Sequence, residues 1–441
     1  MQKLLLTTVS AIALGVSATA AMASGSATYT IQTGNSQSAT IDQSAATNGS
    51  VGTSTDPFVQ QNGVGGGGNV INITQTGADD SVQGQPGGWM VNPPLTGQIG
   101  QSGTGNNATI FQSGGDVSVG GQTVELWQVG TGNGTGNIGA LNGGTIDQGA
   151  GNNQSAAVIE TGNYNQFNIS QQGPTSLVWA PYGLYNGVDL EQSGNNNSGQ
   201  ISQNGIGLRV TAYQTYDYNV LTSFQSGKGN TLSSAQFNTS DGWYNTIWNN
   251  QSGWNNSANI GYGDGAGQNG TDLTITNTQF GASDSLVVAN QGDGAGFNLS
   301  ITNTQGGYKN SLTVTDQAGT NSSITSTQYG AKNTATVTEQ SGNDNIISNW
   351  QSGWKGTATF SQTGSSNTAD LTQTGNWDTA TSTQTGSNSL AWLDQTGDGN
   401  TITGSQNGTG AQNAAYVTQS TNGNTASYSQ SGSGNTVTIH Q

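Results

Sequence analysis

Cysteine is absent from this 441-residue sequence, and histidine occurs once, at His440. Without cysteine the chain has no disulfide framework, no redox-active thiol pair and no thiolate metal site. A single histidine also argues against a Ser-His-Asp catalytic centre and against a zinc site built from several histidines. We therefore expect no enzymatic activity, no catalytic residues, no metal site and no cofactor.

Basic residues are scarce as well. The sequence holds 23 acidic and 6 basic residues, a formal net charge of −17, and the first basic residue after Lys3 is Arg209. A nucleic-acid partner requires a positive stripe that neutralises phosphates, and the sequence offers none. The acidic residues are spread along the chain, so we interpret them as a source of solubility and of mutual repulsion before assembly.

Apolar residues make up only 30% of the sequence, whereas glycine accounts for 70 residues. This apolar content is too low to fill the several globular cores that the length would suggest. The one long apolar stretch, residues 4–21, follows Lys3 and ends in a small-x-small site at residues 21–23. This pattern is typical of a secretory signal, so we expect cleavage after residue 23 and a mature chain without an integral membrane segment.

What the sequence contains instead is an internal repeat. Glutamine recurs every 11 residues from Gln340 to Gln406 and resumes from Gln419 to Gln441, commonly followed by glycine two residues later and asparagine five residues later. The residues that we assign to one structural ladder are Gln101, Asn106, Gln112, Gln192, Asn197, Gln203, Gln340, Asn345, Gln351, Gln362, Asn367, Gln373, Gln384, Gln395, Asn400, Gln419, Asn424, Gln430, Asn435 and Gln441. The glycines that we assign to tight arcs between strands are Gly103, Gly342, Gly353, Gly364, Gly375, Gly386, Gly397 and Gly432.

One unit shows what the repeat encodes. Alternation of period two places Asn367, Ala369, Leu371 and Gln373 on one face, with two threonines and an aspartate on the other. The segment after Gln373 carries glycine, which supplies the positive φ of a tight arc. Each unit is therefore predicted to be one short strand followed by one turn.

A unit of this kind cannot fold alone, because one alanine and one larger apolar side chain bury too little surface to offset the entropy of ordering the chain. Stacking solves the problem, since every backbone group then pairs with the rung above and below, and inward amides bond along the stack. We therefore predict an all-β, amyloid-like β-solenoid of stacked strand-turn-strand units, with about 22 residues per rung and at most about 19 rungs. Sparse charge should let the units stack without placing like charges on one another.

The regularity is uneven along the chain. All six prolines lie before residue 182, and proline cannot donate to a strand ladder. We expect interrupted repeats over residues 24–208, with Gly/Pro-rich insertions at about 52–100 and 174–187, and regular repeats over 209–441. Within the first insertion we expect a single strand pair near Ile71 and Ile73.

The motif Gln-x-Gly-x-x-Asn-x-Ala-x3-Gln, complete at residues 101–112 and 362–373, resembles the curlin repeat of curli, the amyloid fibres of bacterial surfaces. The resemblance implies export through the Sec pathway of a Gram-negative bacterium, passage through a curli-type outer-membrane pore and nucleated self-assembly. It further implies a surface fibre (fimbrium) that supports adhesion and the biofilm matrix, with other copies and other curlin-like subunits as partners. The role of main subunit, nucleator or accessory protein stays open.

Other interpretations remain beside this one. Outward threonines at residues 274–278 and the Gly-Trp pairs ending in Trp254 and Trp354 fit a monomeric β-solenoid adhesin that binds carbohydrate or ice. The Asn/Gln/Gly/Ser-rich composition also allows the monomer to be disordered before assembly. A polysaccharide-acting enzyme lacks an acid/base pair, because the pair at residues 79–80 fits a solvated turn. Residues 267–273 resemble a calcium-binding turn, but such sites require repetition.

The C-terminal end of the repeat bears on how copies of the chain would associate. The pattern continues to Gln441, with no polar capping segment after it. An uncapped rung presents an unpaired strand edge, which is a template for another copy of the chain. We therefore expect end-to-end polymerisation.

Overall fold

The computed structural model describes most of the chain after residue 26. The described residues are 27–28, 30–34, 38–43, 45–46, 48, 50–51, 58–63, 70–76, 81–83, 101–104, 106–113, 123–131, 133, 137–138, 141–142, 144–149, 154–173, 186–238, 244–261 and 267–441. The predicted signal peptide at 1–23, the acidic pair at 79–80 and most of the segment 174–187 lie outside these residues.

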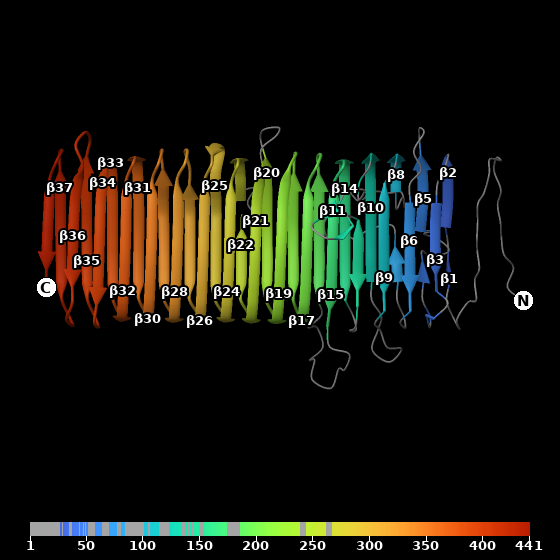
Figure 1. The fold of residues 1–441 in the computed structure, drawn as a ribbon, viewed down its shortest axis with the longest axis horizontal. Helices are drawn as coiled ribbons and strands as arrows, with labels where there is room; N and C mark the ends of the chain where they lie inside the picture. The colour runs from blue at the N-terminus through green and yellow to red at the C-terminus, as the bar shows by residue number, and fades with distance from the viewer. Residues whose placement is uncertain are drawn as a thin grey trace, which may run out of the picture.

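Strands account for all the regular structure in these ranges, which contain no helix and therefore none that could cross a membrane. The chain passes alternately through two parallel sheets, sheet A with 20 strands and sheet B with 16. Successive strands lie side by side along the long axis, from the N-terminal to the C-terminal end (Figure 1). The fold is a β-solenoid, as the sequence predicted.

The strand bounds follow the repeat. Sheet A contains β1 (Ala27–Thr28), β2 (Thr30–Gly34), β4 (Ser50–Val51), β5 (Phe58–Gly63), β7 (Ser81–Gln83), β8 (Gln101–Thr104), β10 (Thr123–Thr131), β14 (Ser155–Asn163), β16 (Gly187–Ser193), β18 (Arg209–Thr215), β20 (Thr231–Asn238), β22 (Ser257–Ile260), β23 (Gly267–Thr271), β25 (Ser285–Phe297), β27 (Ser311–Gln317), β29 (Thr334–Ser341), β31 (Thr357–Ser365), β33 (Thr379–Ser387), β35 (Thr401–Gly408) and β37 (Thr425–Ser431). Sheet B contains β3 (Ser38–Asp42), β6 (Val70–Gln75), β9 (Asn107–Gln112), β13 (Thr145–Gln148), β15 (Gln166–Gln172), β17 (Ser198–Ile206), β19 (Asn219–Lys228), β21 (Asn245–Trp254), β24 (Thr274–Ala282), β26 (Ser300–Tyr308), β28 (Ser323–Ala331), β30 (Ile346–Trp354), β32 (Thr368–Asn376), β34 (Ser389–Thr396), β36 (Asn413–Gln419) and β38 (Thr436–His440). A separate antiparallel pair joins β11 (Asn137–Ile138) and β12 (Leu141–Asn142).

Register repeats from one rung to the next. In sheet B, Gln351 is paired with Gln373, and Gln373 with Gln395, so identical repeat positions lie on one another. The separation is 22 residues between Gln351 and Gln373 but 37 between Gln75 and Gln112. The extra residues of the N-terminal rungs lengthen the connections without shifting the register of the paired glutamines.

The core lies between the two sheets. In β32, Ala369 and Leu371 are buried while the intervening side chains face outward, as the period-two pattern requires. Phe360 of β31 belongs to the same apolar cluster, which runs along the solenoid. Each rung adds only a few apolar side chains, and stacking makes them continuous.

The segment 52–100 differs from its expected irregular form. Three strands within it, β5, β6 and β7, join the two sheets. Ile71 and Ile73 of β6 are fully buried, and Gln61 of β5 is paired with Gln101 of β8. Strands of both sheets therefore form within the described parts of this segment.

Candidate assembly site: the stacked amide columns

Buried glutamines of consecutive strands form a hydrogen-bonded column in sheet B. Gln351 Nε2 donates to Gln373 Oε1 at 2.7 Å, and Gln373 Nε2 donates to Gln395 Oε1 at 2.8 Å. Every link has the same direction, with the donor on the N-terminal side. The column contains Gln43, Gln75, Gln112, Gln148, Gln171, Gln203, Gln225, Gln251, Gln279, Gln305, Gln328, Gln351, Gln373, Gln395, Gln419 and Gln441.

Sheet A carries a second column with the same polarity. Gln340 Nε2 donates to Gln362 Oε1 at 3.0 Å, and Gln362 Nε2 donates to Gln384 Oε1 at 2.7 Å. One member of this column is an acid, Glu160. The members are Gln101, Gln128, Glu160, Gln192, Gln214, Gln236, Gln268, Gln291, Gln317, Gln340, Gln362, Gln384, Gln406 and Gln430.

In most column glutamines the second N–H binds the backbone of the opposite sheet. Gln373 of sheet B donates to the backbone oxygen of Thr357, the first residue of β31 in sheet A, at 3.1 Å. Gln362 of sheet A donates to the backbone oxygen of Ile346, at the start of β30 in sheet B, at 2.9 Å. Both amide hydrogens and the amide oxygen are thus bonded, which removes the penalty of burying an amide.

The predicted asparagines make a different set of bonds. Asn345 Oδ1 accepts from the backbone N–H of Asn367, one rung further on, at 3.1 Å. Asn345 Nδ2 donates to the backbone oxygens of Ser341 in its own arc and Gly364 in the next rung, at 2.9 and 2.8 Å. The asparagines therefore bind the backbone of the arcs, whereas the glutamines bind one another. The same bond, from a backbone N–H of the next rung to the asparagine Oδ1, is made at Asn106, Asn197, Asn367 and Asn400. Near the C-terminal end, Asn424 Nδ2 donates to Thr421, and Asn435 donates to Asn413 and Ser431.

The arc glycines sit where the chain turns between strands. At Gly364 φ is +111°, and an added Cβ would lie 1.8 Å from the backbone oxygen of Gly386 in the next rung. Both the left-handed backbone and the close stacking therefore require glycine. Positive φ is found at Gly342, Gly353, Gly364, Gly375, Gly386, Gly397 and Gly432, and Gly103 lies within β8.

A second left-handed position lies two residues after these glycines, and the sequence pattern missed it. It is occupied by Lys355 (φ 60°), Ser366 (φ 57°) and Trp377 (φ 55°) in successive arcs. Lysine and tryptophan rarely adopt this conformation, so composition carried no signal for it. Only the spacing from the glycine could have indicated this position. In one arc it is held by a residue that favours the left-handed backbone, Asn255, two residues after Gly253.

A third amide column, inside the core, was also missed. Asn277 Nδ2 donates to Asn249 Oδ1 at 2.7 Å, and Asn303 Nδ2 donates to Asn277 Oδ1 at 2.8 Å. These asparagines stand two residues before a column glutamine, at a position that holds Ile201 and Leu371 in other rungs. Their donors point toward the N-terminal end, opposite to the glutamine columns.

Three acids occupy positions that amides hold in neighbouring rungs: Glu160, Asp284 and Asp378. Each has one buried carboxylate oxygen without a hydrogen-bond partner: Glu160 Oε1, Asp284 Oδ2 and Asp378 Oδ2. Burial raises the pKa of Glu160 to about 8 and the pKa of Asp284 to about 6, and it also raises the pKa of Asp378. A carboxylate lacks the two N–H donors of an amide, so these rungs are weakened when the group ionises.

The outer surface carries rings that contact one another across rungs. Tyr329 and Trp350 have centroids 5.4 Å apart, and Trp354 and Trp377 have centroids 5.0 Å apart. Trp254, which shares its Gly-Trp motif with Trp354, is 66% exposed. The aromatic residues thus lie outside the amide columns.

The charges do not stack as the sequence suggested. Lys309, Lys332 and Lys355 occupy the same arc position in three consecutive rungs, since the residues before them are paired in register. The expectation that like charges avoid one another along the stack is wrong here. Each lysine lies over an aromatic ring instead, with Lys355 Nζ 4.7 Å from the centroid of Trp354.

No metal centre is found within the ranges that the structure describes, where no three His, Cys, Asp or Glu side chains gather around a common point. The turn that resembles a calcium site contributes Asp272, at a left-handed position after β23. The threonines of β24 face outward and are partly exposed, with Thr274 and Thr276 as examples.

Together, the parallel two-sheet stack and its one-way amide columns define a structural solenoid built from a repeated strand-arc unit. A family model described as the curlin associated repeat matches residues 350–375 and 364–397, which span β30 to β34. The match confirms that residues 350–397 resemble the curlin repeat. A comparison with curated proteins finds no match to the chain.

Proposed function

We propose that the protein is an exported structural subunit that stacks end to end with other copies into a curli-like amyloid fibre on the bacterial surface. The single observation that carries the proposal is the continuity of the amide columns up to the last described rung. In that rung Gln441 Nε2 donates to the backbone oxygen of Thr425, and Gln419 Nε2 donates to Gln441 Oε1, so the column reaches the last described residue. The fibre would serve adhesion and the biofilm matrix, without catalytic activity.

The two ends of sheet B are complementary. In β38, Val437 and Ile439 are partly buried against the core, and in β3 the equivalent residues are Ala39 and Ile41. Stacking β38 of one copy on β3 of the next would continue both apolar columns. It would bury side chains that now have a neighbour on one side only among the described strands.

The donor direction gives this stacking a polarity. Each column glutamine donates toward the C-terminal end, so within a column a rung donates on its C-terminal side and accepts on its N-terminal side. A fibre that keeps this direction from copy to copy would be head to tail. The reverse pairing would place donors against donors. Secretion through a curli-type pore and association with other curlin-like subunits belong to the same proposal.

Gly432 provides a test that separates folding from assembly. Its φ is +93°, and among the described residues an added Cβ would meet only Asn435 Nδ2, at 3.9 Å. In a head-to-tail fibre that Cβ would strike the backbone of the next copy, as the interior glycines show. Gly432→Ala should therefore leave the free chain folded while blocking seeded elongation, measured by thioflavin fluorescence of the mature chain.

Gly399→Ala is the matched control. Its φ is +71°, and nothing lies within 4 Å of its added Cβ, so it carries a comparable backbone strain without approaching a neighbouring rung. The control should elongate like the unmodified chain. Equal elongation of Gly432→Ala and Gly399→Ala, or a mature chain that stays soluble for days with seeds present, would overturn the proposal.

A further inference from the structure

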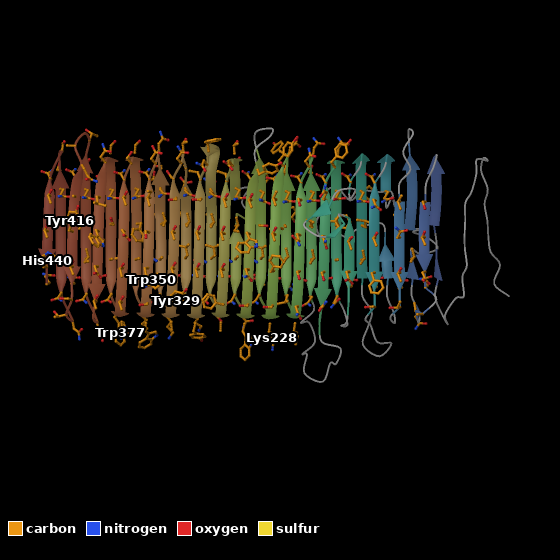
Figure 2. The ribbon with its side chains drawn as sticks, viewed as in Figure 1. Lys228, Tyr329, Trp350, Trp377, Tyr416 and His440 are labelled. Carbon is orange, nitrogen blue, oxygen red and sulfur yellow. The ribbon has the colours of Figure 1, made fainter. Side chains whose placement is uncertain are left out.

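The cations of the described chain gather on one edge of the solenoid. Lys309, Lys332 and Lys355 follow the strands of sheet B in three consecutive rungs, and Lys228 lies at the end of β19 on the same side. Figure 2 shows Lys228 and Trp377 along this edge. Residues 306–309, 329–332, 352–355 and 374–377, which form the successive arcs, contain no acid. The protein is otherwise strongly acidic, so this edge is where an anion can approach.

The lysine positions carry a backbone cost and an electrostatic cost. All three residues have left-handed backbones, with φ between 57° and 61°, a conformation that suits glycine or asparagine. These residues also follow one another on adjacent strands, which lie about 4.8 Å apart in a sheet, and like charges on adjacent strands destabilise it. A bound anion would relieve the repulsion.

Aromatic rings are interleaved with these ammonium groups. Trp354 lies between Lys332 and Lys355, whose Nζ atoms are 5.4 and 4.7 Å from its centroid, and Lys355 also lies 6.0 Å from Trp377. Lys309 Nζ is 5.0 Å from the ring of Tyr308. Trp354 and Trp377 remain 36% and 51% exposed, so ring surface is still open to a ligand.

A second strip of rings runs beside the array on the outer face of sheet B. Phe280 reaches Tyr329 across an intervening rung, with centroids 5.9 Å apart, and Tyr329 contacts Trp350 (Figure 2). Gly306 makes this possible, because a Cβ there would lie 2.4 Å from the Phe280 ring. The rings therefore form a nearly continuous apolar track parallel to the lysines.

From this juxtaposition we infer that the edge formed by Tyr308, Lys309, Lys332, Trp354, Lys355 and Trp377 binds a linear anionic polysaccharide built of hexuronic acid units. A pyranose ring presents an apolar C–H face that packs on an aromatic ring, while its carboxylate accepts from an ammonium group. The sugar units of an extended chain advance by nearly the same distance as one rung. One polymer can then bring carboxylates to more than one lysine of the array.

A second copy of the chain is another possible partner for the lysine edge, with the acids of its opposite edge facing the lysines. That edge fits the lysines less well than the polysaccharide does. In the described arcs from Asp272 to Asp344, Asn298 and Asn321 separate the two acids, so no carboxylate stands on three consecutive rungs there. Single-stranded nucleic acid would also combine stacking with phosphate contacts. The overall charge of −17 opposes it, because nucleic-acid affinity depends on neutralising many phosphates.

The test is calorimetric titration of the β-folded mature chain, free or assembled, with an oligogalacturonate, a neutral cello-oligosaccharide of equal length and oligothymidylate. The oligogalacturonate should bind most tightly, and its affinity should fall with rising salt. Changing Lys309, Lys332 and Lys355 together to Asn, the residue found at the equivalent Asn255, should weaken its binding about tenfold or more while keeping the fold. Trp354→Leu should weaken binding to a similar degree.

Two control variants remove cations or an exposed aromatic ring that do not belong to the proposed binding array. The double variant Arg209→Gln with Lys228→Asn removes two cations outside the array, and Trp392→Leu removes an exposed ring that is paired in register with Asp370. Both should bind oligogalacturonate as the unmodified chain does. Binding that is absent, unaffected by the triple lysine change, or weaker than that of oligothymidylate would overturn the inference. The titration can be made on the free folded chain as well as on the fibre. A failure of fibre assembly can therefore be told apart from a failure of polysaccharide binding.

Discussion

Gln128 Nε2 donates a hydrogen bond of 2.7 Å to Glu160 Oε2, so a carboxyl group occupies a place that amides hold elsewhere in the sheet A column. The next link is missing: Glu160 Oε1 and Gln192 Oε1 are both buried without a hydrogen-bond partner. These residues are paired in register on adjacent rungs. Two oxygen atoms can be joined only if one carries a proton, so a protonated Glu160 would complete the column.

This relationship predicts that stability depends on pH. Burial raises the pKa of Glu160 from its ordinary value of 4.5 to about 8, so its ionised form is disfavoured in the folded state. The free energy of unfolding should be highest below about pH 4.5 and should fall as the pH rises toward 8, by roughly 3–5 kcal/mol. Glu160→Gln, which supplies the missing N–H, should largely remove this loss in denaturant titrations of the mature chain. An unchanged pH profile in Glu160→Gln would contradict the assignment.

Asp284 predicts a similar effect over a lower range. Its Oδ1 accepts from the backbone N–H of Asn310 at 2.9 Å, but Oδ2 has no partner, and burial raises its pKa from 3.8 to about 6. Stability should therefore be lost as the pH rises from about 4 to about 6. Asp284→Asn should stabilise the chain at neutral pH, as judged by the denaturation midpoint. Asp370→Asn, on the outer face of β32, is the control and should leave the midpoint nearly unchanged.

The glutamine columns should matter more than the outer threonines. Removing the Gln362 amide would leave the Gln340 N–H, the Gln384 Oε1 and the Ile346 oxygen without their bonds. Each unpaired buried group costs about 1–3 kcal/mol, so Gln362→Ala combined with Gln373→Ala should destabilise the fold strongly and slow assembly. Thr368→Ala combined with Thr372→Ala should have a small effect. Equal lag times for the two double variants in thioflavin kinetics would contradict the inward assignment of the glutamines.

Close stacking of the arcs predicts a graded response to alanine. Gly364→Ala would place a Cβ 1.8 Å from the Gly386 oxygen, so the two rungs must separate, and unfolding should occur at a markedly lower denaturant concentration. The loss should exceed that of Gly399→Ala, whose added Cβ has open space around it. If the two variants lose the same stability, the cost is backbone strain alone and the arcs are not closely packed.

Much of this architecture could be read from residue spacing. The period-two alternation from Asn367 to Gln373 predicted an inward face, and all four inward residues are buried. That inference was possible because a strand has only two faces and the repeat states which one is apolar. In the segment 52–100, glycine and proline hid the pattern of β5 and β7, and only the strand at Ile71 and Ile73 was expected.

The different hydrogen-bond partners of the glutamines and the asparagines could not be predicted from residue spacing. Glutamine and asparagine carry the same functional group, and the repeat presents both at regular intervals. The longer side chain of Gln373 reaches the next glutamine, whereas the shorter side chain of Asn345 reaches only the neighbouring backbone. Side-chain reach decides between these partners only once the strands have a register.

The sequence alone determined that this protein is a stack of strand-arc units. Its 11-residue spacing and low apolar content argue against independent globular cores and leave rung-on-rung pairing as the means of satisfying the backbone. The tertiary structure decided which residues meet across rungs: the direction of the glutamine donors, the buried acids within the columns and the lysines aligned with Trp354. These relationships join residues about 22 positions apart, and only the register of the parallel sheets places them in contact.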